Sequence, residues 1–348
     1  MFQRDIRVFY PLQNGHMVLR TDEDWDRDVE PNAVDTIGTA GNEGQIFTFK
    51  ISSPKDHVYY KPCIRDGNAF YWSTGPNKLV HMTRPEPRDV YPHFFSEGGG
   101  HVTKIQTMHS LVLGREVRMR FYLPPGYSEN LLKRYPVVYM HDGKNLFFPE
   151  EAFHGREWQV DETLGVLDRM NAIDRTIVVG IYSPNRLHDY SMPGYEAYGH
   201  ALVEEIKPRV DLLLRTLQRP ESTAVAGSSL GGLAAFYIAW QYPDVFGRAA
   251  CLSSAFWYQN DLLERVAQDP LEPRHHLRIY LDSGWPGDNY EVTLSMAHAL
   301  VAAGFRYGEN LLHFAFPYAR HNEDAWAARY HLPIQFFLGR LRPNDSGH

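Results

Sequence analysis

The chain has 348 residues, enough to bury a sizeable core and, at ordinary domain sizes, to form about two domains. Its formal net charge of −7 excludes the strongly basic surface that nucleic-acid-binding and anionic-membrane-binding proteins carry. No apolar run reaches the ~18 residues of a membrane span.

The cysteines, the histidines and the N-terminal residues bear on location and cofactors. Only Cys63 and Cys251 are present, so the sequence predicts no disulfide framework and favours a reducing compartment. The segment "MFQRDIRVFYPLQNG" lacks the apolar core of a signal peptide, so we expect a cytoplasmic protein, or a secreted one if a leader has been removed. The 17 histidines do not cluster at metal-binding spacings, and we expect neither a metal nor another cofactor.

Short β-like runs, turn residues and aromatics dominate residues 1–97. "GQIFTFKI" and "HVYYKPCI" alternate as half-buried strands do, and "RDGNAFYWSTGPN" is rich in turn residues. No amphipathic helix is evident, so we predict a small all-β sandwich here. The prolines and glycines of "PRDVYPHFFSEGGGH" are typical of a linker, which places a second domain at residues 98–348.

Strand and helix patterns alternate in the second domain. "HVTKIQTMHS" and "REVRMRFYLP" predict an opening antiparallel pair, and the strands "YPVVYMHDG", "RTIVVGIY", "STAVAGSS", "GRAACLSS", "HLRIYLDSG" and "NLLHFAFP" follow. Between and after them lie the helical segments "EWQVDETLGVLDRM", "YEAYGHALVEEIKPRVDLLLRTL", "LGGLAAFYIAWQYP", "EVTLSMAHALVAAG" and "EDAWAARYHLPIQFFLGR". Continuous apolar strands between helices predict an α/β fold whose mostly parallel sheet is covered on both faces. Pro208 is expected to kink or break its helix.

The stretch "GSSLG", residues 227–231, fits the pattern G-x-S-x-G with Ser229 at its centre. An apolar strand precedes it and an apolar helix follows, which is the context of a nucleophile that stands clear of a sheet on a strained turn. Glycines fit on both sides because these positions come close together in such a turn. The alternative is a tight turn with a capping serine. We interpret Ser229 as the nucleophile and Ser228 as a residue that shapes the turn.

A serine nucleophile needs a base and an acid, which in this context follow in the chain order serine, acid, histidine. The histidines after Ser229 are His275, His276, His298, His313, His321, His331 and His348. We favour His321, because it follows the last predicted strand and can reach the carboxyl edge of the sheet. The acid should follow "LRIYLDSG". Asp288 in the next loop is favoured over Asp282 at the strand end and Glu291, although either aspartate could instead be a turn or capping carboxylate.

The oxyanion hole of such a site needs two N–H donors. One should be the amide of Leu230, directly after the nucleophile, and the other the amide of Lys144 in the loop after "PVVYMHDG". Gly143 would let that backbone turn close to the site. His141 and Asp142 could form a second acid–base pair, but we favour an Asp142 that braces the loop.

Residues 102–340 resemble the putative esterase family of α/β-hydrolases, which includes esterase D, enterochelin esterase, feruloyl esterase catalytic domains and the antigen 85 mycolyltransferases. The stretches that carry the resemblance are "YLPPGY", "YPVVYMHDGKNLF", "WQVDETL", "IVVGIYSPNRLHDY", "EEIKPRVD", "VAGSSLGGLAAFYIAWQYPDVFG" and "RHNEDAW". Together they are far more specific than the serine motif alone.

This resemblance implies Ser229 as nucleophile, His321 as base, an acid in the loop after "IYLDSG", and oxyanion amides at Leu230 and Lys144. Members of the family often have a glycine directly before the late histidine. This chain has Arg320 there, which we expect to alter the edge of the pocket.

The first domain resembles, more weakly, the starch-binding-type β-sandwich modules that precede such esterases. That resemblance would make Trp72 and Asn77 sugar contacts. Tyr59, Tyr60, Tyr71 and Trp72 alternate as strand residues do, however, and we expect at least half of them in the core. We therefore favour a structural sandwich over a glycan-binding one.

The sequence thus predicts a serine ester hydrolase that acts on carboxylic esters through an acyl-enzyme. Phe147, Phe148, Phe256 and Trp257 follow strands at the active edge and are candidates to bind substrate, although about half should pack under the loops. An aromatic-lined pocket would suit feruloyl or acetyl esters on glycans, so the expected partner is a small-molecule or glycan-linked ester. The alternatives are an acyltransferase on the same triad and a glycan-binding protein with a vestigial hydrolase domain.

Overall fold

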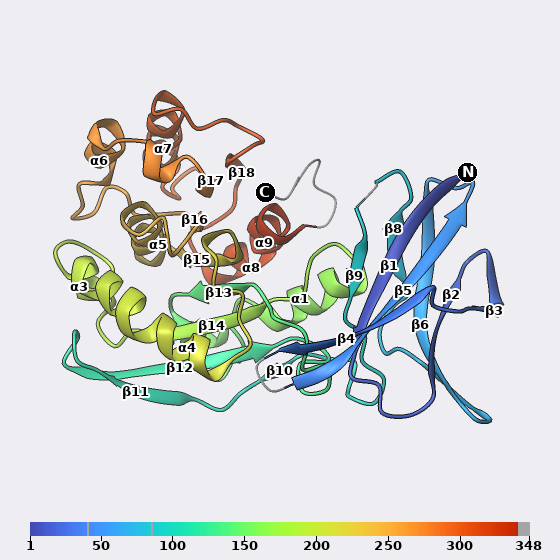
Figure 1. Cartoon of the computed structure of the whole chain (residues 1–348). Coiled ribbons are helices and arrows are strands. Elements are labelled where there is room, and N and C mark those ends of the chain that lie inside the picture. Colours follow the sequence, from blue (N-terminus) through green and yellow to red (C-terminus); the bar gives the residue numbers. More distant parts are fainter. Residues whose placement is uncertain (40–41, 85, 340–348) are drawn as a thin grey trace. The chain divides into compact units, whose positions relative to one another are not determined.

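The computed structural model describes residues 1–39, 42–84 and 86–339, which divide into two compact units (Figure 1). Unit 1 comprises Met1–Gly100, Pro124–Arg134 and Asp168–Asn171, and unit 2 comprises the remaining segments from His101 onward. The expected division at residues 97 and 98 does not include the two later segments that belong to unit 1. The end of the expected second domain, residues 340–348 with His348, lies outside the described residues.

The described residues of unit 1 form two sheets with strand orders β4-β5-β1-β9 and β3-β2-β6-β7, with β8 paired to β6. The strands are β1 (Phe2–Tyr10), β2 (His16–Thr21), β3 (Asp24–Val29), β4 (Ala33–Thr39), β5 (Asn42–Ser53), β6 (His57–Asp66), β7 (Ala69–Trp72), β8 (Lys78–His81) and β9 (Arg88–Val90). Alternate residues of both sheets enter one buried cluster, including Ile6 and Val8 of β1 and Val58 and Tyr60 of β6. This period of two is that of strands with one buried face, and the predicted all-β region is confirmed.

The segment predicted to be a linker is largely part of unit 1. Arg88–Val90 forms β9, which pairs in parallel with β1, and Asp89 forms a salt bridge with Arg7. The backbone amides of Phe94, Phe95 and Ser96 then donate hydrogen bonds to the carboxylate of Glu129. The linker prediction was wrong because the prolines and glycines concealed these long-range backbone contacts.

The expectation that at least half of four aromatic residues lie in the core of unit 1 was also wrong. Tyr60 is fully buried, but Tyr59, Tyr71 and Trp72 are about two-fifths exposed, at 40%, 41% and 41%. Tyr71 and Trp72 belong to β7, which lies at an edge of its sheet, so neighbours cover it less completely. Trp72 packs edge-on against the ring of Phe70.

Unit 2 is built on a sheet with strand order β10-β12-β14-β13-β15-β16-β17-β18, and β11 pairs with β12. Its strands are β10 (His101–Val102), β11 (Gln106–Ser110), β12 (Arg115–Leu123), β13 (Val137–Met140), β14 (Ile177–Tyr182), β15 (Thr223–Ser228), β16 (Arg248–Leu252), β17 (Arg278–Trp285) and β18 (Leu311–Pro317). β12 pairs antiparallel with β11 and β14, as the opening pair predicted, and the strands from β14 to β18 pair in parallel.

Helices cover both faces of this sheet, as the continuous apolar strands predicted. They are α1 (Val160–Arg169), α2 (Arg186–Asp189), α3 (Gly194–Ala201), α4 (Lys207–Leu213), α5 (Leu230–Gln241), α6 (Leu262–Gln268), α7 (Tyr290–Ala302), α8 (Glu323–Arg329) and α9 (His331–Leu338). Figure 1 shows α3, α5, α6 and α7 on one side of the strands and α1, α8 and α9 on the other. Apolar residues of these last three helices share a buried cluster with the strands.

Proline affects two helical segments differently from the prediction. Pro208 lies in the first turn of α4 and does not break the helical backbone, which continues into α4 from the preceding residues. A π-helical turn, Leu202–Ile206, joins α3 to α4, and the amide of Lys207 reaches back to the carbonyl of Leu202. The terminal helical segment is divided at Tyr330 into α8 and α9, and Pro333 cannot donate to the carbonyl of Arg329.

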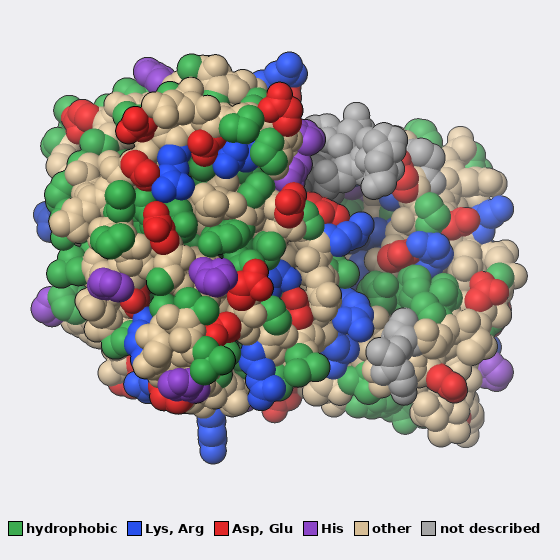
Figure 2. Space-filling model, turned by 60° about the vertical axis from the view of Figure 1, so that its left-hand side comes forward, with side chains coloured by type: hydrophobic (Ala, Val, Ile, Leu, Met, Phe, Trp, Pro, Cys, Tyr) green, Lys and Arg blue, Asp and Glu red, His purple; other side chains and the backbone are tan. Residues whose placement is uncertain are grey.

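The surface carries charges of both signs. Figure 2 shows acidic, basic and hydrophobic side chains interspersed over the face in view. Among the residues of described structure, no helix combines the length and apolar composition that a membrane span requires.

Candidate active site

The sheet topology brings four strand ends of unit 2 together. β15, β16, β17 and β18 are consecutive neighbours and run parallel, so their carboxyl ends lie at one edge. Ser229 directly follows β15, Ser253 directly follows β16, Asp288 lies in the loop after β17, and His321 lies between β18 and α8. This edge is where open parallel sheets of α/β proteins place their sites.

Ser229 sits on a strained turn between β15 and α5. Its backbone has φ 55° and ψ −120°, a conformation that serine rarely adopts. The turn requires glycine nearby, since a Cβ on Gly227 would lie 2.5 Å from the carbonyl carbon of Gly231. Ser228 is the last residue of β15 and is buried, so Ser229 is the serine that faces the other polar groups.

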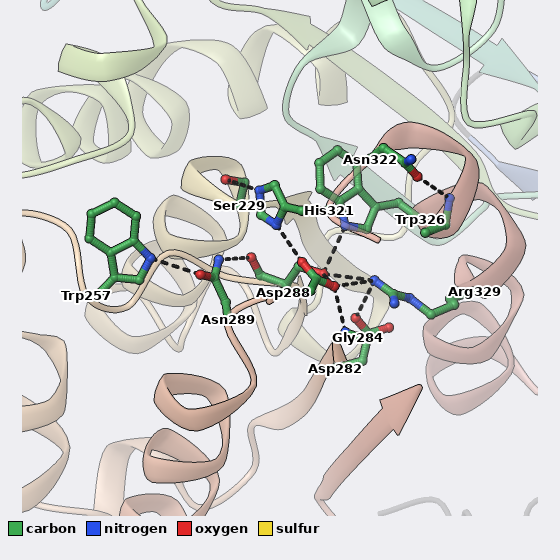
Figure 3. A network of polar contacts seen from close by, with 12 residues as sticks. Ser229, Trp257, Asp282, Gly284, Asp288, Asn289, His321, Asn322, Trp326 and Arg329 are labelled. Atoms are coloured by element: carbon green, nitrogen blue, oxygen red, sulfur yellow. Dashed lines mark hydrogen bonds and ion pairs between the residues drawn. The ribbon is translucent and has the colours of Figure 1, made fainter. Parts of the chain in front are cut away.

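A continuous chain of hydrogen bonds connects Ser229, His321 and Asp288 (Figure 3). His321 Nε2 lies 2.9 Å from Ser229 Oγ, and His321 Nδ1 lies 2.5 Å from Asp288 Oδ1. The Asp288 side chain is fully buried, whereas that of His321 is 36% exposed. Trp326 meets the imidazole edge-to-face, with ring centroids 5.0 Å apart. This geometry suits a base that takes a proton from the serine while a carboxylate holds its other nitrogen.

Burial by itself would raise the pKa of Asp288, but its hydrogen bonds outweigh burial. Contacts with His321, Ser253 and the Gly284 amide lower the pKa of this carboxyl below its usual value. Asp288 therefore stays ionised at neutral pH, as a carboxylate that stabilises an imidazolium must.

Asp282, the second candidate for the acid, has different partners. Its carboxylate accepts a hydrogen bond from Tyr280 at 2.8 Å and forms a salt bridge with Arg329 at 3.2 Å. Burial raises the pKa of Asp282 to about 6, although Arg329 and Tyr280 oppose the rise. Sequence reasoning missed Arg329 and Ser253. A signal for Ser253 was available, because it ends a strand predicted to lie beside that of Ser229.

The two amides expected to bind an oxyanion both lie in first turns of helices. Leu230 is the first residue of α5, where backbone N–H groups lack intrahelical acceptors and the helix dipole is positive. Lys144 lies in a 3₁₀ turn, Gly143–Asn145, directly after β13. The left-handed turn is made by Asp142 at φ 55°. Gly143 is needed for another reason, because a Cβ there would lie 2.6 Å from the backbone of Gly180.

His141 and Asp142 do not pair with each other. His141 Nδ1 lies 3.0 Å from the hydroxyl of Tyr198, and burial lowers the pKa of this imidazole to about 3, so it is neutral. Asp142 binds Arg186 through both carboxylate oxygens, at 2.6 and 2.9 Å, and its amide donates to Tyr190. These contacts agree with the interpretation that Asp142 braces its loop. In the described part of the chain, no three His, Cys, Asp or Glu side chains group as metal ligands would.

The four aromatic candidates for substrate binding have different surroundings. Phe147 is a member of the buried core at 4% exposure, as expected for about half of these four residues. Phe148 is partly buried against that core under Arg120, and Phe256 packs edge-on against a core ring. Trp257 is 63% exposed, and its indole N–H donates to Asn289, the residue after Asp288. Of the four, Trp257 offers an open aromatic surface beside the site (Figure 3).

Known proteins resemble this chain in sequence and in fold. The family model described as "Putative esterase" matches residues 110–329, more than half of the chain. An uncharacterized protein of Bacillus subtilis, YbbA, is 28% identical over 172 residues, which cover 48% of this chain and 67% of that protein.

Two solved structures extend the likeness of fold. A ferulic acid esterase superposes with a TM-score of 0.58 at 18% identity, covering 69% of this chain and 98% of its own. The enterobactin esterase from Shigella flexneri, solved with enterobactin, has a TM-score of 0.58 at 16% identity and covers 97% of this chain and 93% of its own. The match to the family model contains Ser229, Asp288 and His321, and the fold is that of serine hydrolases. The chain therefore belongs to the putative esterase family of α/β-hydrolases and is a carboxylic ester hydrolase.

Proposed function

We propose that the protein hydrolyses carboxylic esters through a triad in which Ser229 is the nucleophile, His321 the base and Asp288 the acid. The observation that carries this proposal is the unbroken hydrogen-bond chain from Ser229 Oγ through both imidazole nitrogens to Asp288. The strained backbone of Ser229 supports it, because such strain recurs where a side chain must be presented for chemistry.

In the acylation step, Ser229 Oγ attacks the ester carbonyl carbon as His321 Nε2 accepts the hydroxyl proton. The amides of Leu230 and Lys144 would bind the oxyanion of the tetrahedral intermediate, where losing one donor typically costs about 10²–10³-fold in turnover. The intermediate collapses when the C–O bond to the alcohol breaks, and His321 gives its proton to the departing oxygen. An acyl-enzyme remains.

In the second step, His321 takes a proton from water, which attacks the acyl carbonyl. Collapse releases the carboxylic acid and returns the proton to Ser229. Asp288 holds the Nδ1–H of His321 throughout and stabilises the imidazolium that forms in each step.

For substrates, we infer a preference for flat, aromatic acyl groups such as feruloyl over acetyl. The support is the exposed indole of Trp257, which its hydrogen bond to Asn289 holds beside the triad. Flat rings stack favourably on such a surface. The likeness of fold to a ferulic acid esterase agrees with this preference.

The test is hydrolysis of p-nitrophenyl acetate by wild type, Ser229→Ala and Ser228→Ala. We expect Ser229→Ala to lower kcat by at least about 10³-fold, because it removes the nucleophile. Ser228→Ala removes the neighbouring hydroxyl and serves as the matched control, with kcat within several-fold of wild type. Equal rates for wild type and Ser229→Ala would refute the proposed nucleophile.

A further inference from the structure

Ser253 occupies a central position under the proposed triad. It directly follows β16, the strand between those that carry Ser229 and Asp288, and it is fully buried. Its hydroxyl oxygen lies 3.0 Å from Trp326 Nε1, 2.9 Å from Arg329 Nη2 and 2.7 Å from Asp288 Oδ2. No other side-chain hydroxyl described here joins α8 to the loop of the proposed acid in this way.

The numbers of donor hydrogens and acceptor lone pairs determine which group donates in each hydrogen bond of Ser253. A serine hydroxyl has one proton and two acceptor lone pairs, while indole and guanidinium nitrogens can only donate. Trp326 and Arg329 therefore fill the acceptor sites of Ser253, and its single proton is directed to Asp288 Oδ2. The amide of Gly284 donates to the same oxygen at 2.6 Å. Oδ2 is thus held by two donors, and Oδ1 is left for His321.

Arg329 also links two buried carboxylates. Its side chain is 4% exposed, and Nη2 lies 3.2 Å from Asp282 Oδ1 and 3.8 Å from Asp288 Oδ2. The titratable groups around this pair come from several elements. Besides Asp282 and Asp288 themselves, these groups are Tyr280 of β17, Cys251 of β16, His321 of the loop after β18 and Arg329 of α8.

We propose that Ser253 and Arg329 are positioning residues that orient Asp288 so that Oδ1 faces His321, and that Asp282 balances the charge of Arg329. This inference rests on the proposed triad. Neither residue would touch substrate. Their effect on the reaction would pass entirely through the acid, whose carboxylate could otherwise rotate away from the imidazole.

The first experiment removes the Ser253 hydroxyl. Ser253 has φ 44°, so Ser253→Gly deletes the hydroxyl at a backbone that glycine accepts readily, and Ser253→Ala deletes it while retaining Cβ. The matched control is Ser254→Ala. Ser254 is equally buried, and its hydroxyl has no hydrogen-bond partner among the described residues.

We expect the Ser253 variants to lower kcat for p-nitrophenyl acetate about 10–100-fold per active site with KM unchanged, because misplacing a catalytic group costs about that much. Active sites are counted by the burst of p-nitrophenol released from diethyl p-nitrophenyl phosphate, so unfolded molecules do not contribute. The Ser254→Ala control should stay within twofold. A Ser253→Gly kcat within twofold of wild type, or an equal loss in Ser254→Ala, would overturn the positioning role.

The second experiment tests the charge arrangement with Asp282→Asn. Without Asp282, the positive charge of Arg329 acts on Asp288 alone and weakens the stabilisation that Asp288 offers to a protonated His321. The acid limb of the kcat/KM profile should therefore move to lower pH. If the acid limb of the kcat/KM profile stays at its wild-type pH, the ion pair between Asp282 and Arg329 has only a structural role. Two results would instead refute the triad itself, namely no labelling of wild type by the organophosphate, or activity retained by Ser229→Ala. Both can be told apart from a failure of the positioning role alone.

Discussion

Ser229 combines backbone strain with a polar side chain that two other loops meet. A non-glycine residue in such a conformation costs on the order of 1–3 kcal/mol, which the surrounding packing must offset. Close contact between Gly227 and Gly231 allows the turn, and His321 receives the presented hydroxyl. The two aspartates differ in their partners, since Asp288 contacts the imidazole of His321 and Asp282 contacts Arg329.

The two aspartates should therefore respond differently to the same isosteric change. Asp288→Asn should lower kcat by about 10⁴-fold, because an amide holds the imidazole in the wrong tautomer and cannot stabilise its charge. Asp282→Asn should retain kcat within about tenfold, since it lacks contact with His321. Steady-state kinetics on p-nitrophenyl acetate, with folding checked by circular dichroism, compares the two. If Asp282→Asn lowered kcat more than Asp288→Asn, Asp282 and not Asp288 would be the acid of the triad.

Trp257 provides a residue-level test of substrate preference. Trp257→Ala should lower kcat/KM for methyl ferulate about 2–10-fold, the contribution expected of one aromatic contact, while leaving p-nitrophenyl acetate nearly unchanged. Asn289→Ala, which frees the indole N–H, should have a smaller effect in the same direction. An equal loss on both esters would show that Trp257 supports the site in general and does not select the acyl group.

At the scale of elements, the carboxyl ends of four parallel strands bring the residues of the candidate site together. The helices around these strands carry charges of their own. Helix α1 begins with two acidic residues, Asp161 and Glu162. Acidic residues suit a helix N-terminus, but here burial, followed by repulsion from Glu162 and Glu157, raises the pKa of Asp161 to about 7.

This raised pKa predicts a pH-dependent stability of α1. The folded value exceeds the ordinary 3.8, so the stabilising contribution is complete below about pH 4 and is lost progressively as the pH rises from there through about 7. Asp161→Asn should raise the melting temperature at pH 8 by roughly 2–4 °C, for about 1 kcal/mol, and raise it by clearly less at pH 5. Thermal unfolding at both pH values measures this. A gain of equal size at pH 5, or a loss at pH 8, would contradict it.

At the scale of the molecule, each compact unit has a buried core and one buried cysteine. Cys63 lies in unit 1 and Cys251 in unit 2, and both are fully buried. Burial raises the pKa of Cys63 to about 12 and that of Cys251 well above its ordinary value, so neither is present as the reactive thiolate at neutral pH. Thiol exposure therefore reports on the unfolding of the unit that carries the cysteine.

We expect the native protein to react negligibly with dithionitrobenzoate over an hour and to release two thiols per chain after unfolding in urea. Labelling Cys251→Ala against urea concentration should report the unfolding of unit 1, and labelling Cys63→Ala that of unit 2. Rapid labelling of the wild type without urea would contradict the burial of at least one thiol, and the two variants would identify which one.

Local patterns in the sequence determined much of this description. Strand-like and helix-like periodicity predicted the all-β region and the parallel sheet, because these patterns depend on neighbouring residues only. The motif around Ser229 indicated its turn for the same reason. Chain order then pointed to Asp288 and His321, which the structure brings within hydrogen-bond distance of one another.

Contacts between distant residues were decided by the tertiary structure alone. Ser229 and His321 are 92 residues apart, and Ser253 and Arg329 are 76 apart, so no local pattern links them. The burial of Phe147, the exposure of Trp72 and the strand in the supposed linker likewise depend on which elements pack together. The different partners of Asp288 and Asp282 have the same origin. These two carboxylates lie six positions apart on one segment of chain, and they acquire different partners only when neighbouring strands and α8 surround them.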